Sequence, residues 1–223
     1  MSKLHHFVLD PYSRRVRLAL AEKNMGVALA DERPWAPSQQ LAGLNPSCLL
    51  PVLVEDSGRA ICGVEAVGEF LEEKNASPSL LPGNAYQRAE IRRLVAWFDV
   101  KFYTEVSEPL LTEKVIRRFA PGSASPDTVR VRNALQKLRP HLDYIAWLAE
   151  ERSWLAGGDL SLADLAAAAH ISAIDYLGDV NWQENQVAKS WYQRIKSRPS
   201  FRVLLSDAVA AMPPSANYAD LDF

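Results

Sequence analysis

The chain reads LLPVLV at residues 49–54, EDSGR at 55–59 and AICGVEA at 60–66. Two short apolar runs flank a polar turn that contains Gly58, and this pattern predicts a β-hairpin. Pro51 stands at the start of the first run, where a residue without an N–H is tolerated, and its peptide bond is a candidate for the cis form. We expect a cis bond to leave the backbone of Val52 free to pair with an extended peptide.

The hairpin leads into a helix predicted over residues 65–74, with apolar residues at Val67, Phe70 and Leu71. The N-terminus of this helix would offer free N–H groups to an anion. Ahead of the hairpin, the pattern predicts a strand over 3–9, a helix over 13–21, a strand over 27–32 and a short helix over 38–44. This β-α-β-α-β-β-α order is that of a thioredoxin-like α/β domain, which we assign to residues 1–76.

The second part of the chain is predicted to be entirely helical. Residues 77–86 contain two prolines and a glycine and are typical of a linker. Helical periodicity follows over 85–111 and 127–150. Ser161 and Asp164 form a capping-box pattern ahead of a small, apolar helix that we expect to be buried on all sides. We assign residues 87–211 to an all-α domain and 212–223 to an extended tail.

Composition narrows the classes of function. The chain has 223 residues, a formal net charge of -2 and two cysteines. This charge gives no long-range attraction to nucleic acid or to an anionic membrane, and the cysteine and histidine spacing predicts neither a disulfide framework nor a metal site. No run approaches the roughly 20 apolar residues of a membrane-spanning helix. We therefore expect a cytoplasmic protein without a metal.

The segments around Pro51 carry a resemblance. Asn45-Pro46, Leu50-Pro51-Val52-Leu53 and Val64-Glu65-Ala66 resemble the glutathione-binding half of the cytosolic glutathione S-transferases, and residues 161–174 and 191–201 are similar to later parts of that family. The resemblance implies the glutathione S-transferase fold, a cis proline, a homodimer, a residue after the proline that pairs with glutathione, and a Glu-Ser pair that binds its γ-glutamyl end. Here Ala66 replaces the serine, so that hydroxyl is missing.

The resemblance also implies a thiol-activating residue in the turn before the first helix, and this position holds Asp10. An ionised aspartate donates no hydrogen bond and raises the pKa of a neighbouring thiol. Tyr12 and Ser13 are the candidate replacements if the protein is an enzyme. The alternative is that Ser13 caps the helix, with Asp10 solvated and Arg14, Arg15 and Arg17 forming a polar helix face.

Two functions stay open at this point. One is a glutathione S-transferase that uses Tyr12 or Ser13. The other is a binding module without a catalytic residue, in which Asp10, Pro51, Val52, Glu65 and Ala66 are remnants of a glutathione site. In the second case no cofactor is expected, and glutathione would bind weakly.

Two segments are candidates for binding a partner protein. The tail ends in Tyr218-Ala219-Asp220-Leu221-Asp222-Phe223, where apolar anchors alternate with acids; the alternative is a solvated terminus. Trp35 lies in a Pro-Trp-Ala-Pro loop and is either an interface anchor or a core residue. The tail and the turn over residues 10–14 also resemble the FtsZ-binding, glutathione-transferase-like division proteins of α-proteobacteria. That resemblance implies a homodimer that binds FtsZ filaments and has no affinity for glutathione.

Overall fold

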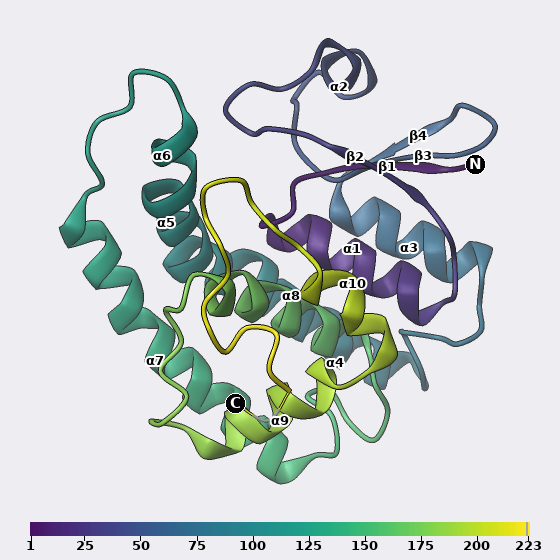
Figure 1. The fold of residues 1–223 in the computed structure, drawn as a ribbon. Coiled ribbons are helices and arrows are strands. Elements are labelled where there is room, and N and C mark those ends of the chain that lie inside the picture. Colours follow the sequence, from purple (N-terminus) through teal and green to yellow (C-terminus); the bar gives the residue numbers. More distant parts are fainter. Residues whose placement is uncertain (222) are drawn as a thin grey trace.

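The computed structural model describes residues 1–221 and 223 and shows an α/β part followed by a helical part (Figure 1). The α/β part contains β1 (Lys3–His6), α1 (Pro11–Glu22), β2 (Ala28–Asp31), α2 (Gln39–Leu44), β3 (Val52–Val54), β4 (Ala60–Cys62) and α3 (Val64–Lys74). The helical part contains α4 (Ala85–Ala96), α5 (Glu108–Leu111), α6 (Arg117–Phe119), α7 (Thr128–Glu151), α8 (Leu162–Tyr176), α9 (Gln186–Lys196) and α10 (Arg202–Leu205). This is the predicted glutathione S-transferase fold.

The four strands form one mixed sheet in the order β2-β1-β3-β4. β1 is parallel to β2 and antiparallel to β3, and β3 and β4 form the predicted hairpin. Its turn contains Gly58 at a φ of +82°, which glycine adopts readily. The Leu50–Pro51 bond is cis, as predicted. α1 and α3 cover the sheet face that looks toward the helical part, whereas α2 lies at the opposite end of the molecule (Figure 1).

The helical part is built around α8, whose 15 residues are all buried. Alanine and other small side chains let neighbouring helices approach closely, and α1 packs directly against α8. The Ser161–Asp164 capping box is present, which confirms that prediction. Residues 85–119 are helical throughout, but Trp97–Ser107 and Thr112–Ile116 are π-helical, which the apolar periodicity did not predict. No helix of the described residues is long and apolar enough to cross a membrane.

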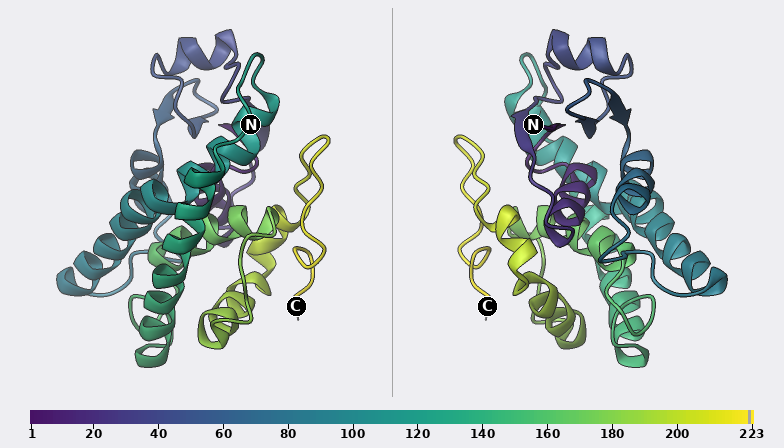
Figure 2. Two further views of the ribbon diagram at one scale, coloured as in Figure 1. Left: turned by 90° about the vertical axis from the view of Figure 1, so that its left-hand side faces the viewer. Right: turned by 90° about the vertical axis from the view of Figure 1, so that its right-hand side faces the viewer.

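The C-terminal segment differs from the expected free tail. After α10 the chain turns back and runs along α8 and α10 to the far end of the helical part (Figures 1 and 2). Tyr218 is fully buried, whereas Asp220 and Leu221 are exposed and Phe223 is half-buried. Tyr218 is therefore a core residue rather than a surface anchor, because its ring and hydroxyl are both used inside the protein. Asp222 lies outside the described residues. The division into residues 1–76, 77–86, 87–211 and 212–223 stays a prediction.

Candidate functional site

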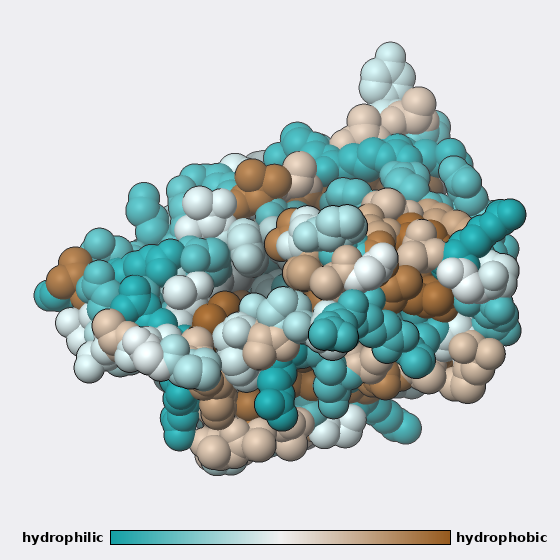
Figure 3. All heavy atoms as spheres, turned by 90° about the horizontal axis from the view of Figure 1, so that it is seen from above, coloured by the Kyte–Doolittle hydropathy of each residue, from teal (hydrophilic) through white to brown (hydrophobic). Residues whose placement is uncertain are grey.

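A cavity of about 310 Å³ lies between the two parts of the molecule. Seen from above, the surface is hollowed between the α6 side and the α2 side, with polar and apolar residues around the hollow (Figure 3). The lining comes from the loops after β1 and β2, from the start of α1, from α2, from the loop before the cis proline and from the helical run over 103–116. It consists of Phe7, Asp10, Tyr12, Arg33, Pro34, Leu41, Ser47, Cys48, Leu49, Leu50, Tyr103, Glu108, Leu111, Thr112 and Ile116.

Asp10 caps α1 and borders this cavity. Its Oδ2 accepts hydrogen bonds from the Ser13 N–H at 2.8 Å and from the Ser13 hydroxyl at 2.6 Å, and Pro11 occupies the first helical position. The expectation that Ser13 caps the helix beside a solvated Asp10 is therefore wrong. Burial raises the pKa of Asp10 to about 6, although the hydrogen bonds from Ser13 act in the opposite direction.

The two hydroxyls proposed as thiol activators are already engaged. The Tyr12 hydroxyl donates to the backbone carbonyl of Asp99 at 2.7 Å, and burial raises its pKa. Ser13 is fully buried, and its oxygen also accepts the Phe7 N–H at 3.4 Å. Neither side chain presents a spare donor to a ligand in the cavity. Neither Tyr12 nor Ser13 therefore offers a hydrogen bond that could stabilise a thiolate.

The residues expected to hold glutathione are placed differently from the prediction. Val52 is fully buried in the middle of the sheet, in register with His5 on one side and Cys62 on the other. Its backbone therefore lies inside the ladder and is not free for a peptide, which corrects that expectation. Leu50, on the other side of the cis bond, lines the cavity instead.

Glu65 and Ala66 begin α3 and are both exposed. The Glu65 carboxylate accepts two hydrogen bonds from the buried Arg15 guanidinium, each at 3.1 Å. Arg15 also forms an ion pair with Asp99 of the helical part. Burial opposes ionisation of Asp99, but Arg15 and the ring of His170 hold its pKa below the usual range. Arg15 thus joins α1, α3 and the helical part through buried charge.

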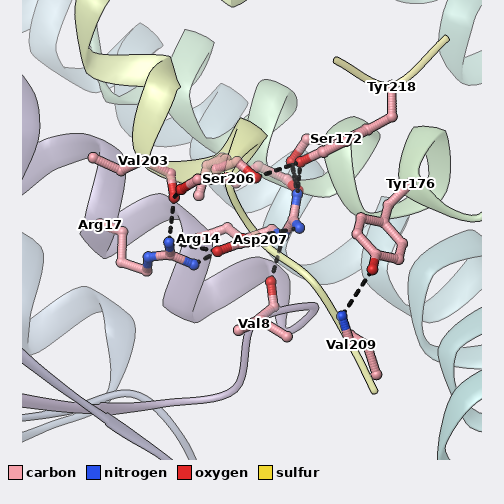
Figure 4. A network of polar contacts seen from close by, with 12 residues as sticks. Val8, Arg14, Arg17, Ser172, Tyr176, Val203, Ser206, Asp207, Val209 and Tyr218 are labelled. Atoms are coloured by element: carbon pink, nitrogen blue, oxygen red, sulfur yellow. Dashed lines mark hydrogen bonds and ion pairs between the residues drawn. The ribbon is translucent and has the colours of Figure 1, made fainter. Parts of the chain in front are cut away.

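The two other arginines of α1 bind the C-terminal segment. The Arg14 guanidinium donates to Ser172 at 2.8 Å, to the Tyr218 hydroxyl at 2.9 Å and to Asp207 at 3.2 Å (Figure 4). Arg17 forms a bidentate pair with Asp207 at 2.7 and 2.9 Å. Because Arg14, Arg15 and Arg17 are all buried, the prediction of a polar helix face is wrong.

The last residues of the chain lie around a further buried cation, Lys196 of α9. The Lys196 ammonium lies 4.0 Å from the Phe223 ring centroid and 5.8 Å from that of Tyr218. It also donates to the carbonyl of Asn217 at 3.3 Å. Burial lowers the pKa of Lys196, while Asp175 acts against that change. Tyr218 and Phe223 therefore hold the segment to α9 as well as to α1.

Trp35 is half-buried and shared between two parts of the chain. Its ring packs edge-on against Phe7, with centroids 5.6 Å apart, and stacks on Phe119 at 5.3 Å. It also lines a second hollow of about 450 Å³, together with Arg33 and Val209. Trp35 is thus partly packed and partly available at a surface.

The sequence analysis missed Asp207 and misread Arg14 and Arg15 as part of a polar helix face. The partners of the arginines are up to 204 positions away in the chain, so no local pattern could identify them. Tyr103 lines the cavity, and its hydroxyl has no hydrogen-bond partner among the described residues. In the same part of the chain, no group of three or more His, Cys, Asp or Glu residues has the arrangement of a metal site.

Comparison with known proteins identifies the family to which this fold belongs. Residues 11–74 match the family model for the glutathione S-transferase N-terminal domain. The chain is 48% identical to FtsZ-localized protein A of Caulobacter vibrioides over 99% of its length and 97% of that protein. It superimposes on FzlA from C. crescentus with a TM-score of 0.95 at 48% identity, covering 100% and 99% of the two chains. A crystal structure of a glutathione S-transferase from Rhodospirillum rubrum gives a TM-score of 0.97 at 47% identity, with full coverage of both chains. The chain therefore belongs to the glutathione S-transferase family, within which it is similar over almost its whole length to FtsZ-localized protein A.

Proposed function

We propose that this protein is a division factor that binds FtsZ filaments in the cytoplasm and does not conjugate glutathione. The observation that carries the proposal is the 48% identity, over 99% of the chain, to a protein named for its localisation with FtsZ. The cavity supports the second half of the proposal, because Asp10 occupies the position of a thiol activator and accepts hydrogen bonds rather than donating them.

The alternative is an active glutathione S-transferase. A specific observation favours it, since the Rhodospirillum rubrum protein of the same fold bears that name at 47% identity. In this chain, however, the Tyr12 and Ser13 hydroxyls are both engaged. Glu65 is already paired with Arg15, and Ala66 has no hydroxyl. These contacts favour weak binding of glutathione, and they leave neither the Tyr12 nor the Ser13 hydroxyl available to activate its thiol.

For the partner surface we propose the Trp35 hollow and the exposed end of the C-terminal segment. Leu221 is 40% exposed, and Asp220 beside it is exposed as well. Trp35 supplies an aromatic group at a hollow whose other lining includes Arg33. A partly exposed aromatic residue next to charged residues is a common arrangement at protein interfaces.

We also propose a homodimer. Trp97 and Tyr144 pack with ring centroids 4.5 Å apart, and Trp147 stacks on Tyr144 while 53% of its surface is exposed. An aromatic row of this kind at the surface of the helical part would be protected from water by a second copy. Light scattering at micromolar concentration tests this, and a monomeric mass would contradict it.

The decisive experiment is sedimentation with FtsZ assembled in GTP, run beside glutathione calorimetry and a conjugation assay with a standard electrophile. We expect co-sedimentation, no heat of glutathione binding and background conjugation. Leu221→Glu should reduce co-sedimentation, whereas Val129→Glu, at an exposed position of α7, should not. Robust conjugation without co-sedimentation would reverse the proposal in favour of the enzyme.

A further inference from the structure

The inter-domain cavity contains a carboxylate without a cation partner. Asp10 makes no ion pair with any described residue. Its carboxylate accepts hydrogen bonds from the first turn of α1, two from Ser13 at Oδ2 and one from the backbone N–H of Tyr12. A carboxylate in such a place loses hydration without gaining a counter-charge. The raised pKa of Asp10, about 6 because of burial, reflects that cost.

The other charged groups around the cavity make no ion pair with Asp10 among the described residues. Glu108 accepts a hydrogen bond from Thr112 at 2.9 Å and forms an ion pair with Arg130. Asp99 adds negative potential at Asp10 but is itself paired with Arg15. Arg33 also lines the cavity, and its side chain is exposed. Asp10 is therefore the lining carboxylate that a ligand could neutralise.

Aromatic rings stand next to this carboxylate. The Tyr12 and Tyr103 rings lie with their centroids 4.8 Å apart, and Phe7 lines the same cavity. Ring faces attract organic cations, most strongly where water is excluded. The Tyr103 hydroxyl has no partner among the described residues, and burial together with Asp10 and Glu108 raises its pKa to about 12, so it stays a neutral hydrogen-bond donor.

We propose that this cavity binds a small organic cation, a primary amine that carries an apolar group. The ammonium would bind the Oδ1 side of Asp10, and the apolar group would lie against Phe7, Tyr12 and Tyr103. An anion is disfavoured because the N-terminus of α1, the usual anion-binding element, is already capped by the carboxylate of Asp10. A volume of about 310 Å³ is at the lower end of the range for ligand sites, which suits a ligand as small as benzylamine. This site is additional to the proposed FtsZ-binding surface and does not depend on it.

Benzylamine, benzyl alcohol and benzoate are a matched set of probes that differ in charge. Binding is followed by amide chemical-shift changes in ¹⁵N-labelled protein, at about pH 7.5 and at about pH 5. We expect benzylamine to shift the amides of Asp10, Tyr12 and Tyr103, and to bind up to about tenfold more weakly at the lower pH, where Asp10 is largely protonated. Benzoate should bind more weakly than benzylamine at the higher pH.

Asp10→Asn removes the negative charge but keeps the N-cap of α1, because asparagine is as good a helix N-cap as aspartate. This variant should lose about tenfold or more in affinity for benzylamine at the higher pH while its affinity for benzyl alcohol stays unchanged. The control, Asp159→Asn, removes an exposed charge far from the cavity and should behave as the wild type. Tighter binding of benzoate than of benzylamine, unchanged benzylamine affinity in Asp10→Asn, or shifts confined to residues outside the lining would each overturn the proposal.

Discussion

Replacing Tyr218 by phenylalanine removes a single oxygen atom from the contact between the C-terminal segment and α1. That oxygen accepts a hydrogen bond from the buried Arg14 guanidinium at 2.9 Å and donates one to the carbonyl of Leu204 at 3.0 Å. A hydrogen bond to a charged group contributes about 1.5–3 kcal/mol to stability. We therefore expect Tyr218→Phe to lower the free energy of unfolding by about 2 kcal/mol. For a chain of this length that is a fall in Tm of about 4–8 °C.

Tyr218→Ala also removes a fully buried ring that packs edge-on against Tyr176, with centroids 5.1 Å apart. Loss of a buried aromatic ring costs about 3–5 kcal/mol, so this variant should be destabilised by about 5 kcal/mol or more. Urea unfolding followed by circular dichroism measures both values. Tyr86→Phe and Tyr86→Ala are the matched controls, since Tyr86 is 89% exposed and should change stability by less than about 0.5 kcal/mol. A Tyr218→Ala protein with the wild-type Tm but without FtsZ co-sedimentation would refute this reasoning and restore Tyr218 as a partner anchor.

Three more predictions concern α1 and the start of α3. Arg15→Met should cost about 3–5 kcal/mol in urea unfolding, because it leaves the buried Asp99 carboxylate without its guanidinium partner and with the ring of His170 beside it. Glu65→Gln, at an exposed partner of the same arginine, should cost less than about 1 kcal/mol. The pKa of Asp10 is raised to about 6 in the folded protein, so the folded state binds this proton more tightly than the unfolded state. The free energy of unfolding of the wild type, relative to that of Asp10→Asn, should therefore be highest below about pH 4 and fall by up to about 3 kcal/mol as the pH rises to about 6 and above. Urea unfolding of both proteins across this pH range measures the difference, and a difference that does not change with pH would contradict the prediction. Ala66→Ser should leave glutathione conjugation to 1-chloro-2,4-dinitrobenzene at background, because the hydroxyl at position 66 adds no thiol activator.

The sequence was sufficient for the elements whose signals are local. The cis bond at Pro51, the hairpin around Gly58 and the capping box of Ser161 and Asp164 depend on residues within a few positions of one another, and each is present. The N-cap of α1 was misassigned because Asp10 and Ser13 are both good capping residues, and the choice depends on Pro11 being helical.

The burial of α1 could not be predicted in the same way. Its arginines read as a solvated face because arginine is rarely buried unless it is paired. Their partners are supplied by the tertiary fold: Asp207 reaches Arg17 across 190 positions of the chain. The prediction of an exposed tail was wrong for the same reason, since the site in which Tyr218 is buried is formed by residues of α1, α8 and α10.

Helix stability alone does not explain an aspartate at position 10. Serine is about as good an N-cap, and it would supply the hydroxyl donor that a thiol activator needs. The Asp10 carboxylate is also costly, because burial raises its pKa to about 6 and no described cation offsets its charge. A residue that caps no better than serine and carries a penalty on ionisation is consistent with the role that we propose for its charge in the cavity. The negative charge opposes a thiolate at that position and attracts a cation, so the same substitution accounts both for the loss of glutathione chemistry that we propose and for the amine site.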